Sequence, residues 1–162
     1  MSENSSVVRL LNDDLTGEIE AILVYMQAHF LMEEQHCPTS LTMLEVALDE
    51  MRHVQWLAEK IVDLGGDPEL TPRKLRFAGK DLKTALQRGV FLEQEAIGQY
   101  NEHIAAIAEP EVQRMLAHIR DEEKDHLDEF KELLEELEEA EADRKPTVGD
   151  LTDAGQDETA ER

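Results

Sequence analysis

The sequence predicts an all-α protein, a four-helix bundle in which two antiparallel helical hairpins are joined by a long crossover. Three observations predict this fold. Four long stretches carry apolar residues at helical spacing, breaks with proline or glycine separate them, and the middle break is much longer than the others. The length of 162 residues suits one core, and the single cysteine excludes an internal disulfide.

The helices are expected over about residues 6–35, 41–64, 80–108 and 110–142. Pro38 ends the first, and Thr39 or Ser40 caps the second. The second ends at a pair of glycines, which suit the left-handed turn at a helix C-terminus. Residues 65–79 hold two prolines and three glycines and are expected to form the crossover. Pro110 begins the last helix.

Domain organisation follows from the polarity of the C-terminus. Residues 1–142 are expected to form the bundle domain, and residues 143–162 a polar, flexible tail. No fifth helix is clear in that tail.

Polar residues interrupt each apolar stripe near its middle, where a core-facing position calls for a reason. Each helix has one glutamate there, and the second and fourth add a histidine three residues later. The six residues are Glu18, Glu50, His53, Glu93, Glu123 and His126. Counted from the helix ends, all six lie at about the same height in an antiparallel bundle.

An internal repeat supports this set, since EIEAILVY at 18–25 recurs as EQEAIGQY at 93–100. The repeat offers either Glu18 with Glu93 or Glu20 with Glu95. Position 20 lies about 200° around the helix from position 18, so only Glu18 and Glu93 continue the stripes.

The six residues together suit a pair of metal ions. Four buried carboxylates need compensating charge, and two divalent cations supply it. Oxygen-rich ligands with one imidazole per metal favour iron or manganese over zinc. The adjacent acids Asp49, Glu122 and Asp125 are interpreted as solvated charges.

At these motifs the sequence resembles the ferritin-like superfamily, and within it bacterioferritin. The resemblance covers about residues 7–137 and is carried by LTGEIEAILVY, LDEMRHVQWLAEKIVDLGG, LEQEAIGQY and HIRDEEKDHLDEF. It implies that Glu50 and Glu123 bridge two iron ions, and that Glu18 and Glu93 cap one each. His53 and His126 would each bind one ion. The implied function is ferroxidase activity, the oxidation of Fe(II) to Fe(III) with dioxygen or peroxide, for iron storage and detoxification.

The resemblance also implies further features. Met51 occupies the place of a methionine that ligates haem b between two subunits, with interface packing as the alternative. Tyr25 either assists the redox chemistry or packs in the core. We expect a homo-oligomer, a dimer or larger. Because no fifth helix is clear, the sequence does not predict that the chains form a hollow cage. Residues 147–151, TVGDL, look like the peptides that dock cargo inside encapsulin shells, with an ordinary tail as the alternative.

Other functions use the same residues. A peroxide scavenger, related to rubrerythrin or to manganese catalase, would need the same ligands, and a metal-free interaction bundle would need none. The net charge of −22 argues against a nucleic-acid partner. No apolar run approaches the roughly 20 residues of a membrane span, and no secretory signal begins the chain, so a cytoplasmic location is expected, or one inside a protein nanocompartment.

Overall fold

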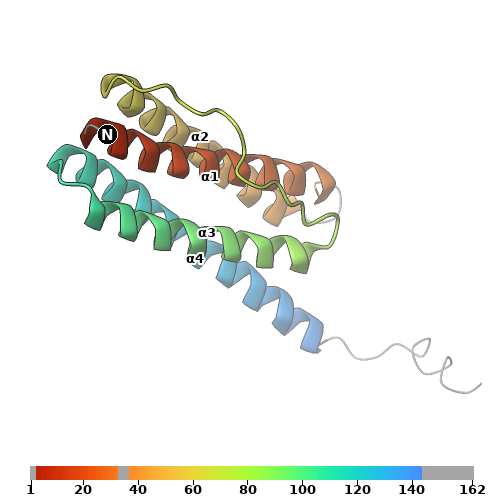
Figure 1. Cartoon of the computed structure of the whole chain (residues 1–162). Helices are drawn as coiled ribbons and strands as arrows, with labels where there is room; N and C mark the ends of the chain where they lie inside the picture. The colour runs from red at the N-terminus through yellow and green to blue at the C-terminus, as the bar shows by residue number, and fades with distance from the viewer. Residues whose placement is uncertain (1–2, 33–36, 144–162) are drawn as a thin grey trace, which may run out of the picture.

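Four helices make up the fold, which confirms the predicted all-α class (Figure 1). The computed structural model describes residues 3–32 and 37–143. The helices are α1 Glu3–Met32, α2 Cys37–Asp63, α3 Leu82–Ala106 and α4 Pro110–Asp143. None of these described helices has an apolar stretch long enough to cross a membrane. The expected tail and its 147–151 peptide lie outside the described residues, so the two-part domain organisation stays a prediction.

The topology is that of two hairpins. α1 packs along α2 and α3 packs along α4, while α1 also contacts α3 and α2 contacts α4. α2 and α3 run in the same direction, so the crossover between them travels the length of the bundle (Figure 1). The fold prediction, including this crossover, is therefore confirmed.

Local chemistry explains where the helices begin and end. Asp81 caps α3, because its side chain accepts a hydrogen bond from the Thr84 backbone N–H at 2.7 Å. At the end of α2, Gly65 adopts φ 80° and donates to the Val62 carbonyl at 2.9 Å, as a C-terminal glycine does. The third helix thus starts two residues later than expected, after its cap.

The start of α2 corrects one prediction. The helix begins at Cys37, so Pro38, Thr39 and Ser40 lie in its first turn and do not precede it. Proline is tolerated there because the first N–H groups of a helix have no intrahelical acceptor. The predicted end of the first helix falls at residues 33–36, which lie outside the described part of the chain.

The core consists of two apolar clusters with a polar layer between them. One cluster includes Met43, Leu86 and Phe130, and the other includes Leu11 and Leu116, each of these at 0% exposure. Burial of such side chains contributes about 1.5–3 kcal/mol each. Along every helix, the predicted ligand positions lie between the two clusters, so the apolar core holds the polar layer from both sides.

Candidate metal centre

The six predicted residues meet at mid-height in the bundle, one or two from each helix. None is more than 6% exposed: Glu18, Glu50, His53, Glu93, Glu123 and His126. Glu18 and Glu93 come from α1 and α3, while α2 and α4 each supply a Glu-x-x-His pair whose members face the same side of the helix. Their role as ligands remains a prediction, but the geometry is that of a donor cluster.

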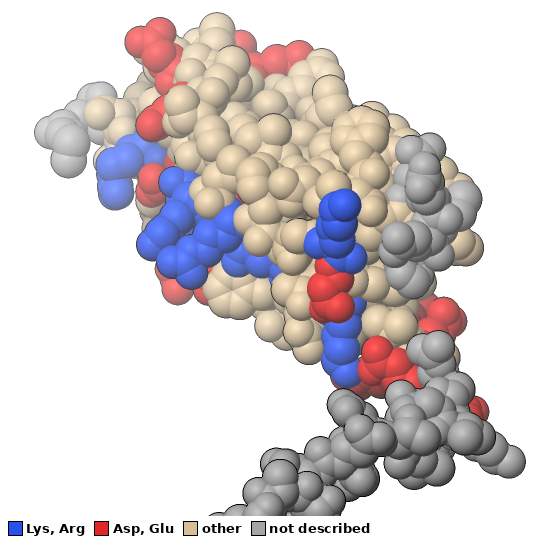
Figure 2. Space-filling view, turned by 90° about the vertical axis from the view of Figure 1, so that its right-hand side faces the viewer, with Lys and Arg blue, Asp and Glu red and all other residues tan. Residues whose placement is uncertain are grey.

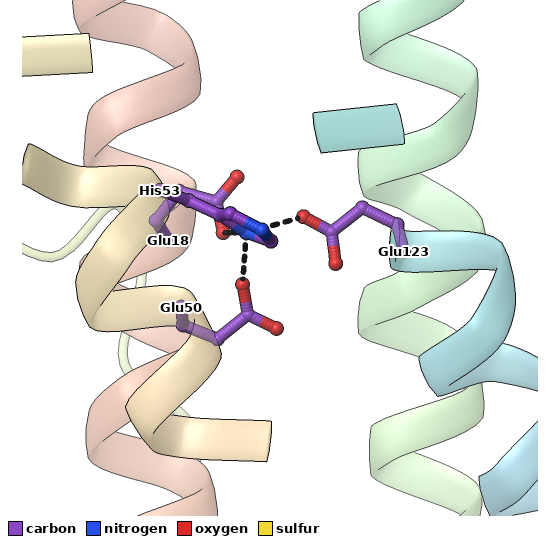
Figure 3. A group of neighbouring side chains, drawn as sticks. All are labelled: Glu18, Glu50, His53 and Glu123. Atoms are coloured by element: carbon purple, nitrogen blue, oxygen red, sulfur yellow. Dashed lines mark hydrogen bonds and ion pairs between the residues drawn. The ribbon is translucent and has the colours of Figure 1, made fainter. Parts of the chain in front are cut away.

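In one half of the cluster, three carboxylates converge on a single imidazole nitrogen (Figure 3). His53 Nδ1 lies 2.8 Å from Glu50 Oε2, 3.0 Å from Glu123 Oε1 and 3.8 Å from Glu18 Oε2. This nitrogen carries at most one proton, so it cannot satisfy three carboxylates. The arrangement therefore suits a cation at the point of convergence.

The other half repeats this arrangement around His126. Its Nδ1 lies 3.1 Å from Glu123 Oε2 and 3.2 Å from Glu50 Oε1. Ligand atoms of Glu50, Glu93, Glu123 and His126 lie within 4.8 Å of one another, as do those of Glu18, Glu50, His53 and Glu123. Glu50 and Glu123 belong to both groups. The two groups thus overlap through a shared pair of carboxylates.

Two buried oxygen atoms show that the cluster is not self-sufficient. Glu50 Oε1 and Glu123 Oε1 have no hydrogen-bond partner among the described residues. Each is near an imidazole nitrogen, yet those contacts do not meet the geometry of a hydrogen bond. Because buried polar atoms are rarely left unpaired, these shared carboxylates fit a site that binds cations.

The electrostatics of the cluster favour proton uptake when no cation is bound. Burial, reinforced by neighbouring carboxylates, raises the pKa of Glu50 and of Glu123 to about 7. Burial also raises the pKa of Glu93 well above its usual value. For His126 burial lowers the pKa, but the adjacent Glu123 and Glu50 carboxylates outweigh this effect and raise the pKa to about 11.

For His53 and for Glu18, the charged neighbours shift the pKa in the direction opposite to the effect of burial. Burial lowers the pKa of His53, and the surrounding carboxylates more than reverse this, so the net pKa is raised. Burial raises the pKa of Glu18, and its interaction with His53 more than reverses that, so the net pKa is lowered. These carboxylates and imidazoles therefore share protons tightly, in the space that cations would otherwise occupy.

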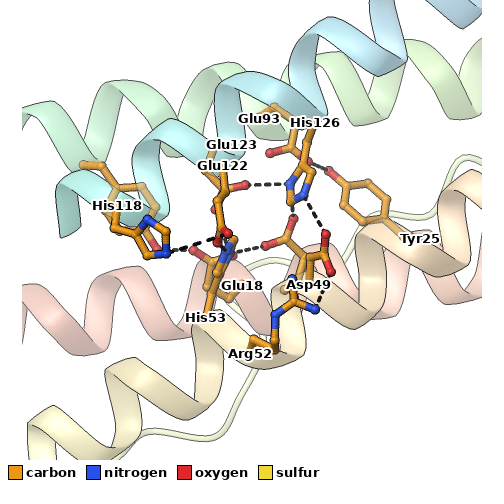
Figure 4. Close-up of polar contacts among 12 residues, drawn as sticks. Glu18, Tyr25, Asp49, Arg52, His53, Glu93, His118, Glu122, Glu123 and His126 are labelled. Carbon is orange, nitrogen blue, oxygen red and sulfur yellow. Dashed lines mark hydrogen bonds and ion pairs between the residues drawn. The ribbon is translucent and has the colours of Figure 1, made fainter. Parts of the chain in front are cut away.

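A carboxylate lies at the outer nitrogen of each imidazole (Figure 4). Glu122 Oε2 is 2.8 Å from His53 Nε2, and Asp49 Oδ2 is 3.4 Å from His126 Nε2. Such contacts orient an imidazole so that its other nitrogen faces a metal. The prediction that Asp49 and Glu122 are merely solvated charges is thus wrong in part. The signal was available, since each acid directly precedes the glutamate of a Glu-x-x-His pair.

Two tyrosines hold Glu93 and Glu18 crosswise. Tyr25 of α1 donates its hydroxyl to Glu93 of α3, and Tyr100 of α3 donates to Glu18 of α1. Burial, and then the nearby carboxylates, raises the pKa of both tyrosines well above the usual value. Each therefore stays a neutral donor. Sequence reasoning selected Tyr25 alone for the site, although the repeat places Tyr100 equivalently.

Other candidates lie apart from the cluster. Glu95 is exposed, and Glu20, although buried, pairs with Arg88 at 2.6 Å. The structure thus brings together Glu18 and Glu93, the pair that continued the stripes. Met51 is 54% exposed on α2, so its side chain lies at the surface of the bundle.

Comparisons with known proteins agree with this architecture. A family model described as a ferritin-like domain matches residues 8–140. A curated bacterioferritin of Desulfovibrio desulfuricans is 27% identical over 127 residues, which are 76% of this chain and 71% of the relative. A curated bacterioferritin of Mycobacterium leprae is 29% identical over 134 residues, 79% of this chain and 83% of the relative.

Solved structures show the same fold. The bacterioferritin of Desulfovibrio desulfuricans, described with its diiron site in different catalytic states, aligns with a TM-score of 0.80 at 24% identity, over 85% of this chain and 82% of that one. The bacterioferritin of Mycobacterium tuberculosis aligns with a TM-score of 0.76 at 23% identity, over 83% of this chain and 87% of that one.

Proposed function

The chain belongs to the ferritin-like family, and from this membership and its buried donor cluster we propose that it is an iron-binding ferroxidase. It oxidises Fe(II) to Fe(III) with dioxygen or peroxide at a dinuclear centre, for iron storage and detoxification. The ligands are the six residues Glu18, Glu50, His53, Glu93, Glu123 and His126. Similarity to two curated bacterioferritins supports storage over the alternative.

One observation carries this proposal. Two groups of four donors, each compact enough for one ion, overlap through Glu50 and Glu123. Two sites that share two carboxylates hold their ions side by side, as paired electron transfer requires. Four carboxylates and two neutral imidazoles carry a charge that two divalent cations balance, and the donors suit iron or manganese.

The residues around the centre have different roles in the proposed reaction. The iron pair, when bound, supplies two electrons to one molecule of oxidant. Asp49 and Glu122 keep the inner nitrogen of each imidazole directed inward. Tyr25 and Tyr100 orient Glu93 and Glu18 through neutral hydrogen bonds, and a redox contribution from Tyr25 is part of the proposal. The two apolar clusters pack against the centre from its two ends.

A substitution at the shared position tests the ferroxidase function. Replacing Glu50 with Ala removes a ligand from both groups, and the fast oxidation of two Fe(II) per chain should fall by at least about 100-fold, because even outer-shell changes cost 10–100-fold. The rate is measured by rapid mixing of anaerobic Fe(II)-protein with dioxygen, and separately with peroxide. Elemental analysis of protein purified without added metal distinguishes iron from manganese.

Glu45→Ala serves as the matched control, because Glu45 is an exposed acid on α2 that belongs neither to the cluster nor to the cavity beside it. It should retain the wild-type rate, and circular dichroism should show intact helices in both variants. Wild-type oxidation by Glu50→Ala would refute the proposed centre.

We further propose that chains associate into a homo-oligomer through α1 and α2. Exposed apolar side chains recur there at near-heptad spacing: Leu23 and Phe30 on α1, and Leu41, Leu48, Met51 and Val62 on α2.

Haem b between two chains, ligated by Met51, fits the exposed position of that side chain. A cytoplasmic location, and docking in an encapsulin shell through residues 147–151, complete the proposal. An absorption spectrum and a measured mass of the purified protein check the haem and the oligomer.

A further inference from the structure

A cavity of about 290 Å³ opens between α1, α3 and the crossover, and its inner wall reaches the metal centre. Glu18, Glu50 and Glu93 form that wall. Four basic side chains also line the cavity: Arg73, Lys74, Arg76 and Arg88. We name these four residues the basic rim. Three further acids also line the cavity: Asp14, which lies 2.8 Å from His103, Glu20, which lies 2.6 Å from Arg88, and the exposed Glu95.

The basic rim is unusual because three of its four cations have no carboxylate partner among the described residues. Arg73, Lys74 and Arg76 make no ion pair there, although the chain has 16 Lys and Arg against 38 Asp and Glu. In the space-filling view, Lys and Arg side chains form one group on the left of the face, and a second file on the right alternates with acids (Figure 2). Cations without a carboxylate partner attract an anion.

Two of the four cations are held in position by the bundle. Arg73 donates to the Asp13 carbonyl at 2.6 Å and to Gln99 Oε1 at 2.7 Å. Its guanidinium lies over Gly17, where an added Cβ would be 3.1 Å from Nη2. Close packing on a helix backbone thus fixes this cation at the mouth before any ligand arrives.

Arg88 is fixed in a similar way. It pairs with Glu20 at 2.6 Å, and its guanidinium carbon lies 5.1 Å from the centre of the Phe91 ring. Its Nε is buried and lacks a hydrogen-bond acceptor among the described residues. An unpaired buried N–H donor beside a cavity is a position where a ligand oxygen can bind.

Lys74 and Arg76, the other two cations of the basic rim, are not held by the bundle. The side chains of Lys74 and Arg76 make no hydrogen bond or ion pair with the described part of the chain, although acids are plentiful. They thus remain available for a ligand in the cavity. Lysine and arginine donors around a small volume suit a compact oxyanion.

We propose that this cavity binds a small oxyanion, of the class of inorganic phosphate, between the basic rim and the metal centre. An ionised carboxylate in the inner wall repels an anion. Neutralising that wall, by cations or by substitution, strengthens anion binding, and by linkage the anion strengthens cation binding equally. Only this coupling to metal rests on the proposed function, and the anion site itself does not.

Titration calorimetry with inorganic phosphate tests the site in the metal-free full chain. The double substitution Lys74→Ala and Arg76→Ala should weaken binding by about tenfold or more, because it removes two charge-assisted donors. Arg114→Ala is the matched control, since Arg114 is an exposed cation on α4 outside the cavity, and its affinity should equal that of the wild type. Equal affinity in all three proteins would overturn the proposal.

A second comparison tests whether the phosphate binds next to the metal centre. Glu18→Gln with Glu93→Gln, in metal-free protein with helices verified by circular dichroism, should bind phosphate several-fold more tightly. Loading the wild type with two redox-inert Zn²⁺ per chain should have the same effect. Unchanged affinity in the Gln variant would place the anion away from the centre and overturn the proposal. If the Gln variant binds phosphate more tightly but the wild type takes up no Zn²⁺, the result would contradict the metal centre and leave the anion site standing.

Discussion

At the scale of single residues, the outer nitrogens of the two histidines are held by acids that lie on the opposite Glu-x-x-His helix. Glu122 of α4 contacts His53 of α2, and Asp49 of α2 contacts His126 of α4. Each of these two helices thus supplies a Glu-x-x-His pair to the cluster and an acid that contacts the histidine of the other helix. This exchange explains why an acid precedes both Glu50 and Glu123.

Glu122→Gln tests the outer support. The amide keeps the size of the side chain but removes its charge, so His53 loses basicity and orientation. Metal affinity should fall by about 10–100-fold, measured by competition with a chromophoric chelator. Asp125→Asn, at an exposed acid on the same helix, should leave the affinity unchanged. Equal affinities in the two variants would show that Glu122 does not support the imidazole.

At the scale of the helices, the apolar stripe of α3 contains a glycine where the other helices have larger residues. Gly89 is buried, and an added Cβ would lie 2.8 Å from the ring of Phe130 on α4. Phe130 in turn packs on Tyr25 with ring centroids 5.2 Å apart. The gap in the stripe is thus a packing requirement that lets α4 approach α3 next to the centre.

Alanine substitutions at two glycines of α3 separate packing from helix propensity. Gly89→Ala should lower the free energy of unfolding by about 1–2 kcal/mol, because overpacking costs about 1–3 kcal/mol and exceeds the helix gain. Gly98→Ala has no atom within 4 Å of the new Cβ, so it should raise that free energy by up to about 1 kcal/mol. Urea unfolding measures both. Stabilisation of both variants would mean that Phe130 has room to move.

At the scale of the whole molecule, the buried carboxylates and imidazoles of the cluster make stability depend on pH. Without metal, Glu50 and Glu123 have a folded pKa of about 7 against an ordinary value of 4.5. The folded state then binds more protons than the unfolded chain, so stability falls as pH rises from 4.5 to about 7. His126, raised from 6.5 to about 11, also stabilises below 6.5 and loses this stabilisation as pH rises.

The melting temperature of metal-free protein should therefore decrease between about pH 5 and about pH 8. The lowered pKa of Glu18 opposes this trend, but it is one group against several. Bound metal should raise the melting temperature most at the higher pH, because metal binding displaces protons. Thermal melts with and without Zn²⁺ measure the effect. The double substitution Glu50→Gln and Glu123→Gln should make the melting temperature fall less steeply with pH. An unchanged fall would mean that general charge repulsion causes it, and not these two carboxylates.

The sequence by itself determined the helices, the direction of their buried faces and the six residues that interrupt those faces. These properties are local, since a helix turns by about 100° per residue and any face can be read from spacing alone. Helix ends were less certain, as Pro38 in the first turn of α2 shows, because proline fits both after one helix and at the start of the next.

Only the tertiary structure decided the contacts between helices. The crosswise bonds of Tyr25 and Tyr100, the pairing of Glu20 with Arg88 and the support of His53 by Glu122 all join residues at least 68 positions apart. The basic rim likewise depends on the path of the crossover over α1 and α3. Such contacts follow from the rotation and axial offset of packed helices, and the sequence pattern of one helix does not contain either quantity.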